Sequence, residues 1–180
     1  MTLATMMAAA SNGPSRLSRD VCVDEGTQLL ADRLEVGPED DCLDLGCGYG
    51  VLGLVMANHA PGGTTHLIDS DFVAVEYARR NAEINGIENV QVYLSNGFDH
   101  VPGDARFDVI ASNIPAKVGG QLLGRFLNDA HERLEPGGRL YVVSISRLKD
   151  YMKRNLTERF GNYEKLKQSK LYTAAVARKD

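Results

Sequence analysis

The sequence is poor in cysteine and has no set of side chains spaced to bind a metal ion. Its 180 residues include three cysteines and four histidines. No two cysteines have the Cys-x-x-Cys spacing of a zinc site, and the histidines are scattered. An odd, sparse set of cysteines is typical of a reducing compartment, so we expect a cytoplasmic protein without a zinc site.

The sequence also lacks a long apolar run, an internal repeat and a low-complexity linker. No apolar run approaches the roughly 20 residues that cross a bilayer. Residues 1–10 are apolar but have no basic leader, so we do not expect a signal peptide. We expect residues 1–15 to be a flexible N-terminus and residues 16–180 to form a single domain.

Negative charge predominates in most of the chain, but the last part is basic. Residues 1–138 have 9 Lys and Arg against 20 Asp and Glu, a net charge of 9 − 20 = −11. Residues 139–180 have 11 against 4, a net charge of 11 − 4 = +7. A basic segment of this kind is typical of a surface that contacts the phosphates of a nucleic acid. A solvated helix face has the same composition, so both interpretations stay open.

A glycine-rich turn follows the first apolar run. Residues 42–45 predict a short buried strand, and a helical pattern begins at Val51. Between them, Gly46, Gly48 and Gly50 follow the spacing Gly-x-Gly-x-Gly. A strand, a glycine turn and a helix together present bare backbone N–H groups to a ligand. Gly48 to Gly53 also fits the Gly-x-Gly-x-x-Gly spacing of dinucleotide enzymes, so the turn alone leaves the cofactor open.

An acidic residue strengthens the prediction of a cofactor site. Asp69 ends a second expected strand, residues 64–69, and lies 19 residues after Gly50 (69 − 50). An acid about 20 residues beyond a glycine turn can accept hydrogen bonds from both hydroxyls of a ribose. The pair therefore indicates a cofactor that contains a nucleoside, against the alternative that Asp69 only caps a helix.

Helical and extended patterns alternate along the rest of the chain. We expect helices over residues 25–34, 71–85, 120–134 and 146–160, and further strands over residues 90–94, 107–112, 139–145, 163–167 and 171–178. This order predicts an α/β fold, a Rossmann-like, doubly wound and mostly parallel seven-stranded sheet with helices on both faces. Ligands bind such sheets at the carboxyl ends of the strands. Polar tips fall there after four strands, at Gly46–Gly50, Asp69, Asn96 and Asn113.

Four motifs in order resemble those of class I S-adenosylmethionine-dependent methyltransferases. Asp44 to Gly50 is similar to their first motif, with an acid before the glycines. Residues 134–143 resemble their Pro-Gly-Gly turn and fifth strand, and Asn113-Ile-Pro115 resembles their Asn-Pro-Pro-aromatic motif. The segment 18–27 and the tip Ser95-Asn96 narrow the resemblance to the small-domain methyltransferase family, which includes guanine-N2 methyltransferases of ribosomal RNA. The likeness covers residues 17–178.

The resemblance implies S-adenosyl-L-methionine as the cofactor. The glycine turn would line its methionine part, and Asp44 would orient either the turn or the amino group. Asp69 with Ser70 would hold the ribose, Asn96 would meet the adenine amino group, and Phe98 could cover the adenine ring. Thr27 would close the site from the N-terminal side. The full implied set is Thr27, Asp44, Gly46, Cys47, Gly48, Tyr49, Gly50, Asp69, Ser70, Asn96, Gly97, Phe98 and Asn113.

The implied catalytic residues are Asn113, Ile114 and Pro115. Asn113 Oδ1 and the main-chain carbonyl of Ile114 would accept both hydrogens of an exocyclic amine and turn its lone pair toward the methyl group. Pro115 favours an extended conformation at Ile114, which fixes that carbonyl. Family members usually have Pro at position 114 and an aromatic residue where this chain has Ala116. The missing aromatic ring leaves the recognition of a planar base without its usual stacking partner.

The sequence therefore supports three functional hypotheses. The first is methylation of a nucleobase amino group, guanine N2 in ribosomal RNA, with the basic C-terminal segment, residues 139–180, contacting RNA. The second is methylation of a small molecule or of a protein side-chain amide, because Ala116 replaces the aromatic residue. The third is a donor-binding subunit that has lost catalysis and works with a partner.

Overall fold

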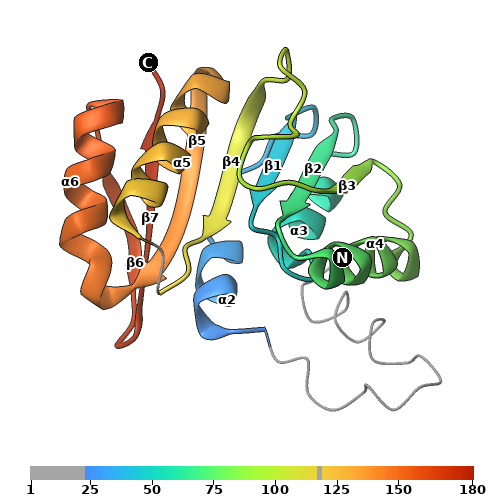
Figure 1. Ribbon diagram of the computed structural model, residues 1–180, viewed down its shortest axis with the longest axis horizontal. Helices are drawn as coiled ribbons and strands as arrows, with labels where there is room; N and C mark the ends of the chain where they lie inside the picture. Colours follow the sequence, from blue (N-terminus) through green and yellow to red (C-terminus); the bar gives the residue numbers. More distant parts are fainter. Residues whose placement is uncertain (1–22, 117–118) are drawn as a thin grey trace.

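The computed structural model describes residues 23–116 and 119–180. The expected flexible segment, residues 1–15, lies outside the described residues. In the described part, seven strands form one sheet in the order β3-β2-β1-β4-β5-β7-β6 (Figure 1). The strands are β1 (Cys42–Leu45), β2 (Thr65–Asp69), β3 (Val90–Leu94), β4 (Phe107–Asn113), β5 (Leu134–Ile145), β6 (Glu164–Gln168) and β7 (Tyr172–Arg178). β1 to β5 are parallel, and β7 is antiparallel to both of its neighbours. The predicted fold class is confirmed.

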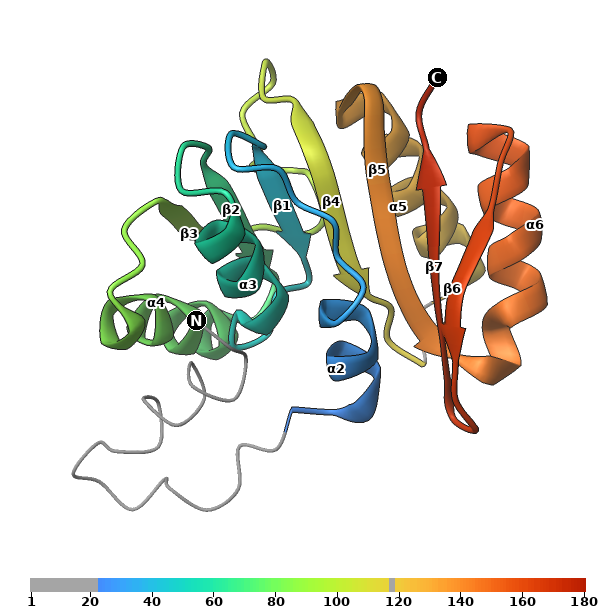
Figure 2. The same cartoon turned by 180° about the vertical axis from the view of Figure 1, so that it is seen from behind.

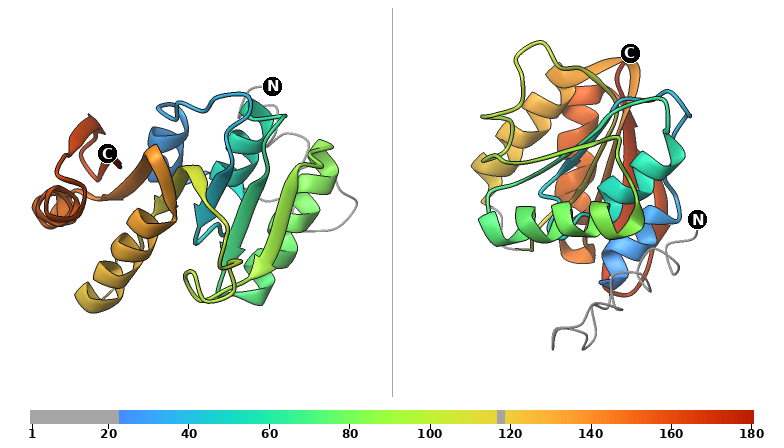
Figure 3. Two further views of the ribbon diagram at one scale, coloured as in Figure 1. Left: turned by 90° about the horizontal axis from the view of Figure 1, so that it is seen from above. Right: turned by 90° about the vertical axis from the view of Figure 1, so that its right-hand side faces the viewer.

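Helices cover both faces of the sheet (Figures 2 and 3). They are α2 (Glu25–Ala31), α3 (Val51–His59), α4 (Phe72–Asn85), α5 (Gly120–Arg133) and α6 (Lys149–Phe160), with a short 3-10 turn η1 (Ser146–Leu148) before α6. Two apolar cores result, one containing residues of α2, α3 and α4 and the other containing residues of α5 and α6. Cys42 of β1 lies in the first core and Leu43 in the second. Successive side chains point to opposite faces of a strand, so β1 is buried on both sides.

Local sequence signals set the ends of α4. Asp71 is its N-cap, and its side chain accepts a hydrogen bond from the N–H of Val73. Gly86 ends the helix in the left-handed conformation, with φ of 64°. Val75, Ala78 and Ala82 form its buried stripe. The expected helix over residues 71–85 is therefore confirmed, because capping and periodicity are both local properties.

Three elements differ by more than one residue from the sequence-based prediction. α2 ends at Ala31 rather than at residue 34, with Asp32 as its C-cap. The expected helix over 146–160 begins with the 3-10 turn η1. β5 begins at Leu134 and runs through the expected turn at 135–138. Within this stretch Gly137 still has the positive φ of a turn residue, 82°, and its N–H donates to the carbonyl of Lys179.

The carboxyl ends of the parallel strands meet at one edge of the sheet, which we call the carboxyl edge. In Figures 1 and 2 this edge lies at the bottom, where the arrowhead of β4 points toward α2. The hairpin between β6 and β7 reaches the same edge, where the N–H of Ser146 donates to the carbonyl of Leu171 (2.7 Å). The start of the described chain at α2 and the β6–β7 hairpin thus both lie at this edge. Among the described residues, no helix is long and apolar enough to cross a membrane.

α3 packs so closely on β2 that one position requires glycine. A Cβ placed on Gly53 would lie 2.4 Å from Cγ of Leu67, which is fully buried. We expect Gly53→Ala to lower the free energy of unfolding by about 1–3 kcal/mol, the usual cost of overpacking. Urea denaturation measures this loss. Gly103→Ala is the control, because its Cβ would meet no atom within 4 Å. Equal stability of the two variants would contradict the packing described.

Candidate functional site

The glycine turn after β1 has an open surface. Gly46, Gly48 and Gly50 all have positive φ, at 72°, 54° and 89°. A Cβ on Gly46 or Gly48 would meet no atom within 4 Å, whereas a Cβ on Gly50 would lie 2.9 Å from Cδ2 of Leu67. Gly50 is therefore required for packing as well as for its φ. Gly46 and Gly48 instead leave space in front of the backbone, as a ligand cradle needs.

Two carboxylates hold this turn in place. Asp44 Oδ2 accepts a hydrogen bond from the N–H of Gly53 (2.7 Å), which ties the start of α3 to β1. Asp69 Oδ2 accepts from the N–H of Gly48 (2.9 Å), and its Oδ1 accepts from the N–H of Asp71 (2.9 Å). Asp69 is partly exposed at the tip of β2. The carboxylate expected at a ribose therefore also supports the turn.

Asp44 is fully enclosed, with 1% of its surface exposed. Burial raises its pKa from the ordinary 3.8 to about 7; the hydrogen bond from Gly53 opposes the rise, and the negative charge of Asp69 adds to it. The sequence left two roles open for Asp44, the turn and a ligand's amino group. Its contact with Gly53 supports a role in holding the start of α3 beside the turn, and a role toward a ligand's amino group stays a prediction.

The other members of the turn lie as follows. Cys47 is buried, and its thiol contacts the carbonyl of Gly48. Burial also raises the pKa of Cys47 well above its ordinary value, so its thiol is not activated as a nucleophile. The carbonyl of Tyr49 accepts from Asn81 Nδ2 (2.9 Å), which fixes the turn to α4. Ser70 is exposed beside Asp69.

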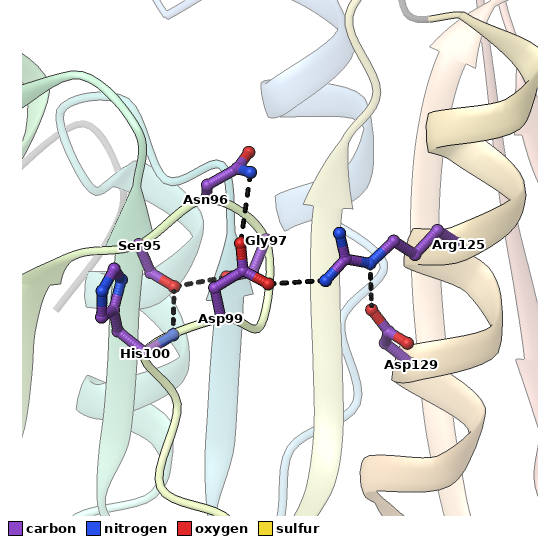
Figure 4. A network of polar contacts seen from close by, with 7 residues as sticks. All are labelled: Ser95, Asn96, Gly97, Asp99, His100, Arg125 and Asp129. Atoms are coloured by element: carbon purple, nitrogen blue, oxygen red, sulfur yellow. Dashed lines mark hydrogen bonds and ion pairs between the residues drawn. The ribbon is translucent and has the colours of Figure 1, made fainter.

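The loop after β3 is fixed by a network of polar contacts (Figure 4). Ser95 Oγ donates to the carbonyl of Gly97 (2.6 Å) and accepts from the N–H of His100 (3.1 Å). Asn96 is exposed, and its Nδ2 donates to Asp99 Oδ2 (3.3 Å). Because Asp99 accepts from the Asn96 amide nitrogen, the amide oxygen of Asn96 is the end left for an external amino group.

The same loop is attached to α5. Arg125 lies between Asp99 (2.6 Å) and Asp129 (3.5 Å), and Figure 4 shows it reaching from α5 to the loop. Gly97 has φ of 58°, and a Cβ there would lie 2.5 Å from the ring of Phe126. Phe98 is 6% exposed and belongs to the core that contains α5 and α6. The ring expected to cover an adenine thus lies mainly within the core.

The tip of β4 is tied to the N-terminus of α2. Asn113 Nδ2 donates to Asp24 Oδ2 (3.1 Å) and to Thr27 Oγ1 (2.9 Å). Asp24 Oδ2 and Thr27 Oγ1 lie 2.5 Å from each other, so both accept on one side of the Asn113 amide nitrogen, and among the described residues no donor is bonded to Asn113 Oδ1. The N–H of Ile114 donates to the carbonyl of Val143 (2.8 Å). The tip therefore presents an amide oxygen as an unused acceptor at the carboxyl edge.

The remaining residues of the tip differ in exposure. The side chain of Ile114 is buried in the core, whereas Pro115 and Ala116 are exposed. A branched apolar side chain at position 114 thus packs inward, away from the exposed residues of the tip. Among the described residues, no group of three His, Cys, Asp or Glu side chains is arranged to hold a metal ion.

Comparison with known proteins decides the family. The family model of the methyltransferase small domain matches residues 14–175. The chain belongs to this family. Ribosomal RNA small subunit methyltransferase C of Salmonella choleraesuis is 37% identical over 172 residues, which are 92% of this chain and 48% of that protein. An uncharacterised Bacillus subtilis protein, YbxB, is 38% identical over 122 residues, 67% of this chain and 61% of that protein. The chain thus spans about half the length of the ribosomal RNA methyltransferases it matches.

Solved structures show the same likeness. The 16S rRNA N2 methyltransferase of T. thermophilus, in complex with AdoMet and guanosine, has 32% identity and a TM-score of 0.76, over 89% of this chain and 44% of that chain. A methyltransferase from Pyrococcus furiosus has 22% identity and a TM-score of 0.68, over 98% and 96% of the two chains. The second likeness shows the fold alone.

Sequence reasoning missed one residue of this methyltransferase small domain. Asp24 contacts Asn113 across 89 positions of the chain. Its position before Glu25 is a signal for a helix N-cap, and the structure confirms that it caps α2. Its second contact depends on where α2 packs, which no local pattern reveals.

We expect the stability of this methyltransferase domain to depend on pH through Asp44. The folded state holds the Asp44 proton up to about pH 7, whereas the unfolded state releases it near its ordinary pKa of 3.8. Stability therefore falls as pH rises through this window. Asp44→Asn keeps an acceptor for Gly53 but cannot ionise. We expect urea denaturation at intervals between about pH 4 and pH 8 to show that the free energy of unfolding of the variant rises relative to that of the wild type as pH rises. A difference that stays constant with pH would contradict the assignment.

Proposed function

We propose that this chain is an S-adenosylmethionine-dependent methyltransferase that transfers a methyl group to an exocyclic amino nitrogen of a nucleobase, guanine N2 in ribosomal RNA. The observation that carries the proposal is the orientation of the Asn113 amide, whose nitrogen is held and whose oxygen is left as an acceptor. The named functions of the Salmonella and T. thermophilus relatives support the choice of ribosomal RNA and of guanine.

The carboxyl edge fits the proposed methyl donor. The space in front of Gly46 and Gly48, which a Cβ would occupy, suits a ligand that lies against the backbone. Asp69 is partly exposed beside this space and would accept from the ribose hydroxyls. Asn96 Oδ1 would accept from the adenine amino group. Thr27, which is 8% exposed, would close the site together with α2. Bound S-adenosylmethionine would supply an electrophilic methyl group at this edge.

The chain's own residues would then position the acceptor amine. An exocyclic amine on a base is a poor nucleophile, because its lone pair is delocalised into the ring. Asn113 Oδ1 and the carbonyl of Ile114 would each accept one of its hydrogens, which directs the lone pair toward the methyl group. Catalysis of this kind comes mainly from orientation. Pro115 restrains Ile114, and the hydrogen bond of Ile114 to Val143 keeps the carbonyl at the edge.

Basic side chains at the carboxyl edge would contact the RNA backbone. Arg147 and Lys149 follow the end of β5, and Lys170 lies in the hairpin beside Ser146. We call these three residues the basic rim. All three are exposed, and among the described residues none of them forms an ion pair with an acid. Unpaired cations next to the proposed acceptor site are placed to bind phosphates.

The experiment that tests the function is transfer of labelled methyl from S-adenosylmethionine to a cell extract, which is then separated into RNA, protein and small molecules. We expect label in RNA. Asn113→Ala should lower the rate by about 10²–10³-fold, because it removes an acceptor used in the transition state. Label mainly in protein or in small molecules would contradict RNA as the substrate and would favour the second hypothesis. Donor binding without any transfer would indicate a non-catalytic subunit.

The basic rim predicts a change in the salt dependence of RNA binding. Removing two phosphate contacts with Arg147→Ala and Lys170→Ala should reduce the slope of log affinity against log salt by roughly 1.5. Fluorescence anisotropy with small-subunit ribosomal RNA measures the slope. Arg106→Ala with Lys165→Ala removes the same charge from exposed positions just before β4 and at the start of β6, at the opposite edge of the sheet. Equal slopes for the two double variants would contradict the contact between the basic rim and RNA.

A further inference from the structure

We propose that Asp24 is a positioning residue for methyl transfer, which fixes the direction of the Asn113 amide through a one-way set of hydrogen bonds. This inference rests on the function proposed above, in which the amide oxygen of Asn113 accepts a hydrogen bond from the amine to be methylated. Asp24 is in neither the expected cofactor-binding set nor the expected catalytic set. Its link to Asn113 comes from the geometry alone.

The Asp24 carboxylate is surrounded by donors. Its Oδ1 accepts from the N–H groups of Gly26 (2.9 Å) and Thr27 (3.1 Å), which is ordinary helix capping. Its Oδ2 accepts from Thr27 Oγ1 (2.5 Å) and from Asn113 Nδ2 (3.1 Å). An ionised carboxylate has acceptors only, so every group that faces it must donate. Capping uses one oxygen, and the other is left for the tip of β4.

The hydroxyl of Thr27 reinforces the same direction. Because Thr27 gives its only hydroxyl hydrogen to Asp24, it can only accept from Asn113 Nδ2 (2.9 Å). Two acceptors therefore face the amide of Asn113. Reversing the amide would place Oδ1 against both and leave the hydrogens without partners. The amide oxygen is thus held on the opposite side, where it is available to a substrate amine.

Packing of α2 delivers Asp24 to this position. A Cβ on Gly26 would lie 2.7 Å from the ring of Tyr172, so the helix lies directly on the start of β7. β7 in turn pairs with β5, and β5 pairs with β4 at Asn113 and Val143. The N-terminus of α2 and the tip of β4 are thereby held by the same part of the sheet. The contact between Asp24 and Asn113 is supported from both sides.

Asp24→Asn separates this role from capping. An asparagine caps a helix about as well as an aspartate, so we expect unchanged stability and unchanged binding of S-adenosylmethionine. Its NH₂ group, however, would face Thr27 and Asn113 and would favour the reversed amide of Asn113. We expect the methyl-transfer rate at saturating substrate to fall by about 10²-fold, as for the loss of an oriented acceptor. Asp32→Asn, at the other end of α2, is the matched control and should retain full activity.

A reciprocal exchange provides the decisive readout. Asn113→Asp alone would set two carboxylates against each other and should be as impaired as Asp24→Asn. Combining Asp24→Asn with Asn113→Asp restores a donor facing an acceptor and leaves a carboxylate oxygen for the amine. We expect the double variant to be at least about tenfold faster than either single variant. A purely structural role of Asp24 would give no such rescue.

The side-chain amide signals of Asn113 give a readout that does not depend on transfer. In the wild type the amide hydrogen that faces Asp24 and Thr27 should exchange with solvent more slowly than the other one, and Asp24→Asn should speed its exchange. Wild-type activity in Asp24→Asn, or a double variant no faster than the single variants, would overturn the inference. If the wild type transfers no methyl to RNA, the proposed function fails, and unchanged exchange in Asp24→Asn would then overturn the positioning role by itself.

Discussion

The site depends on two carboxylates from neighbouring strands, which hold the glycine turn and the helix after it in place. Asp44 of β1 accepts from Gly53, and Asp69 of β2 accepts from Gly48. The two strands pair in parallel, with Asp44 opposite Leu67, so both carboxylates reach the same edge of the sheet. Asp44 is buried in this position, and its burial raises its pKa to about 7. Positive φ at Gly46 and Gly48 then leaves the backbone open to a ligand.

The register of the sheet extends this arrangement to the acceptor side. β1 pairs with β4 so that Asp44 lies opposite Ala111, and Asn113 follows two residues later at the carboxyl edge. α2 meets Asn113 there, and the loop after β3 is fixed to α5 through Asp99 and Arg125. The residues expected at the donor and those expected at the acceptor therefore come from separate segments but share the same edge of the sheet.

The sequence predicted the parts of this arrangement that depend on local signals. The helix capped by Asp71 and Gly86, the glycine turn, and the order of strands and helices are examples, and the predicted family is confirmed. The contact of Asp24 with Asn113 was not predictable, because it depends on where α2 packs against β7. Burial of Phe98 was missed for the same reason, since an aromatic residue at a strand tip can face either the ligand or the core.

The measurement that tests the account most directly is the identity of the methylated product. Ribosomal RNA treated with the purified chain and labelled S-adenosylmethionine would be digested to nucleosides and separated by chromatography with mass spectrometry. The account predicts label in guanosine methylated at N2, because Asn113 Oδ1 and the carbonyl of Ile114 are the proposed acceptors for an exocyclic amine. Label on a ring nitrogen, on a ribose hydroxyl or in protein would contradict it.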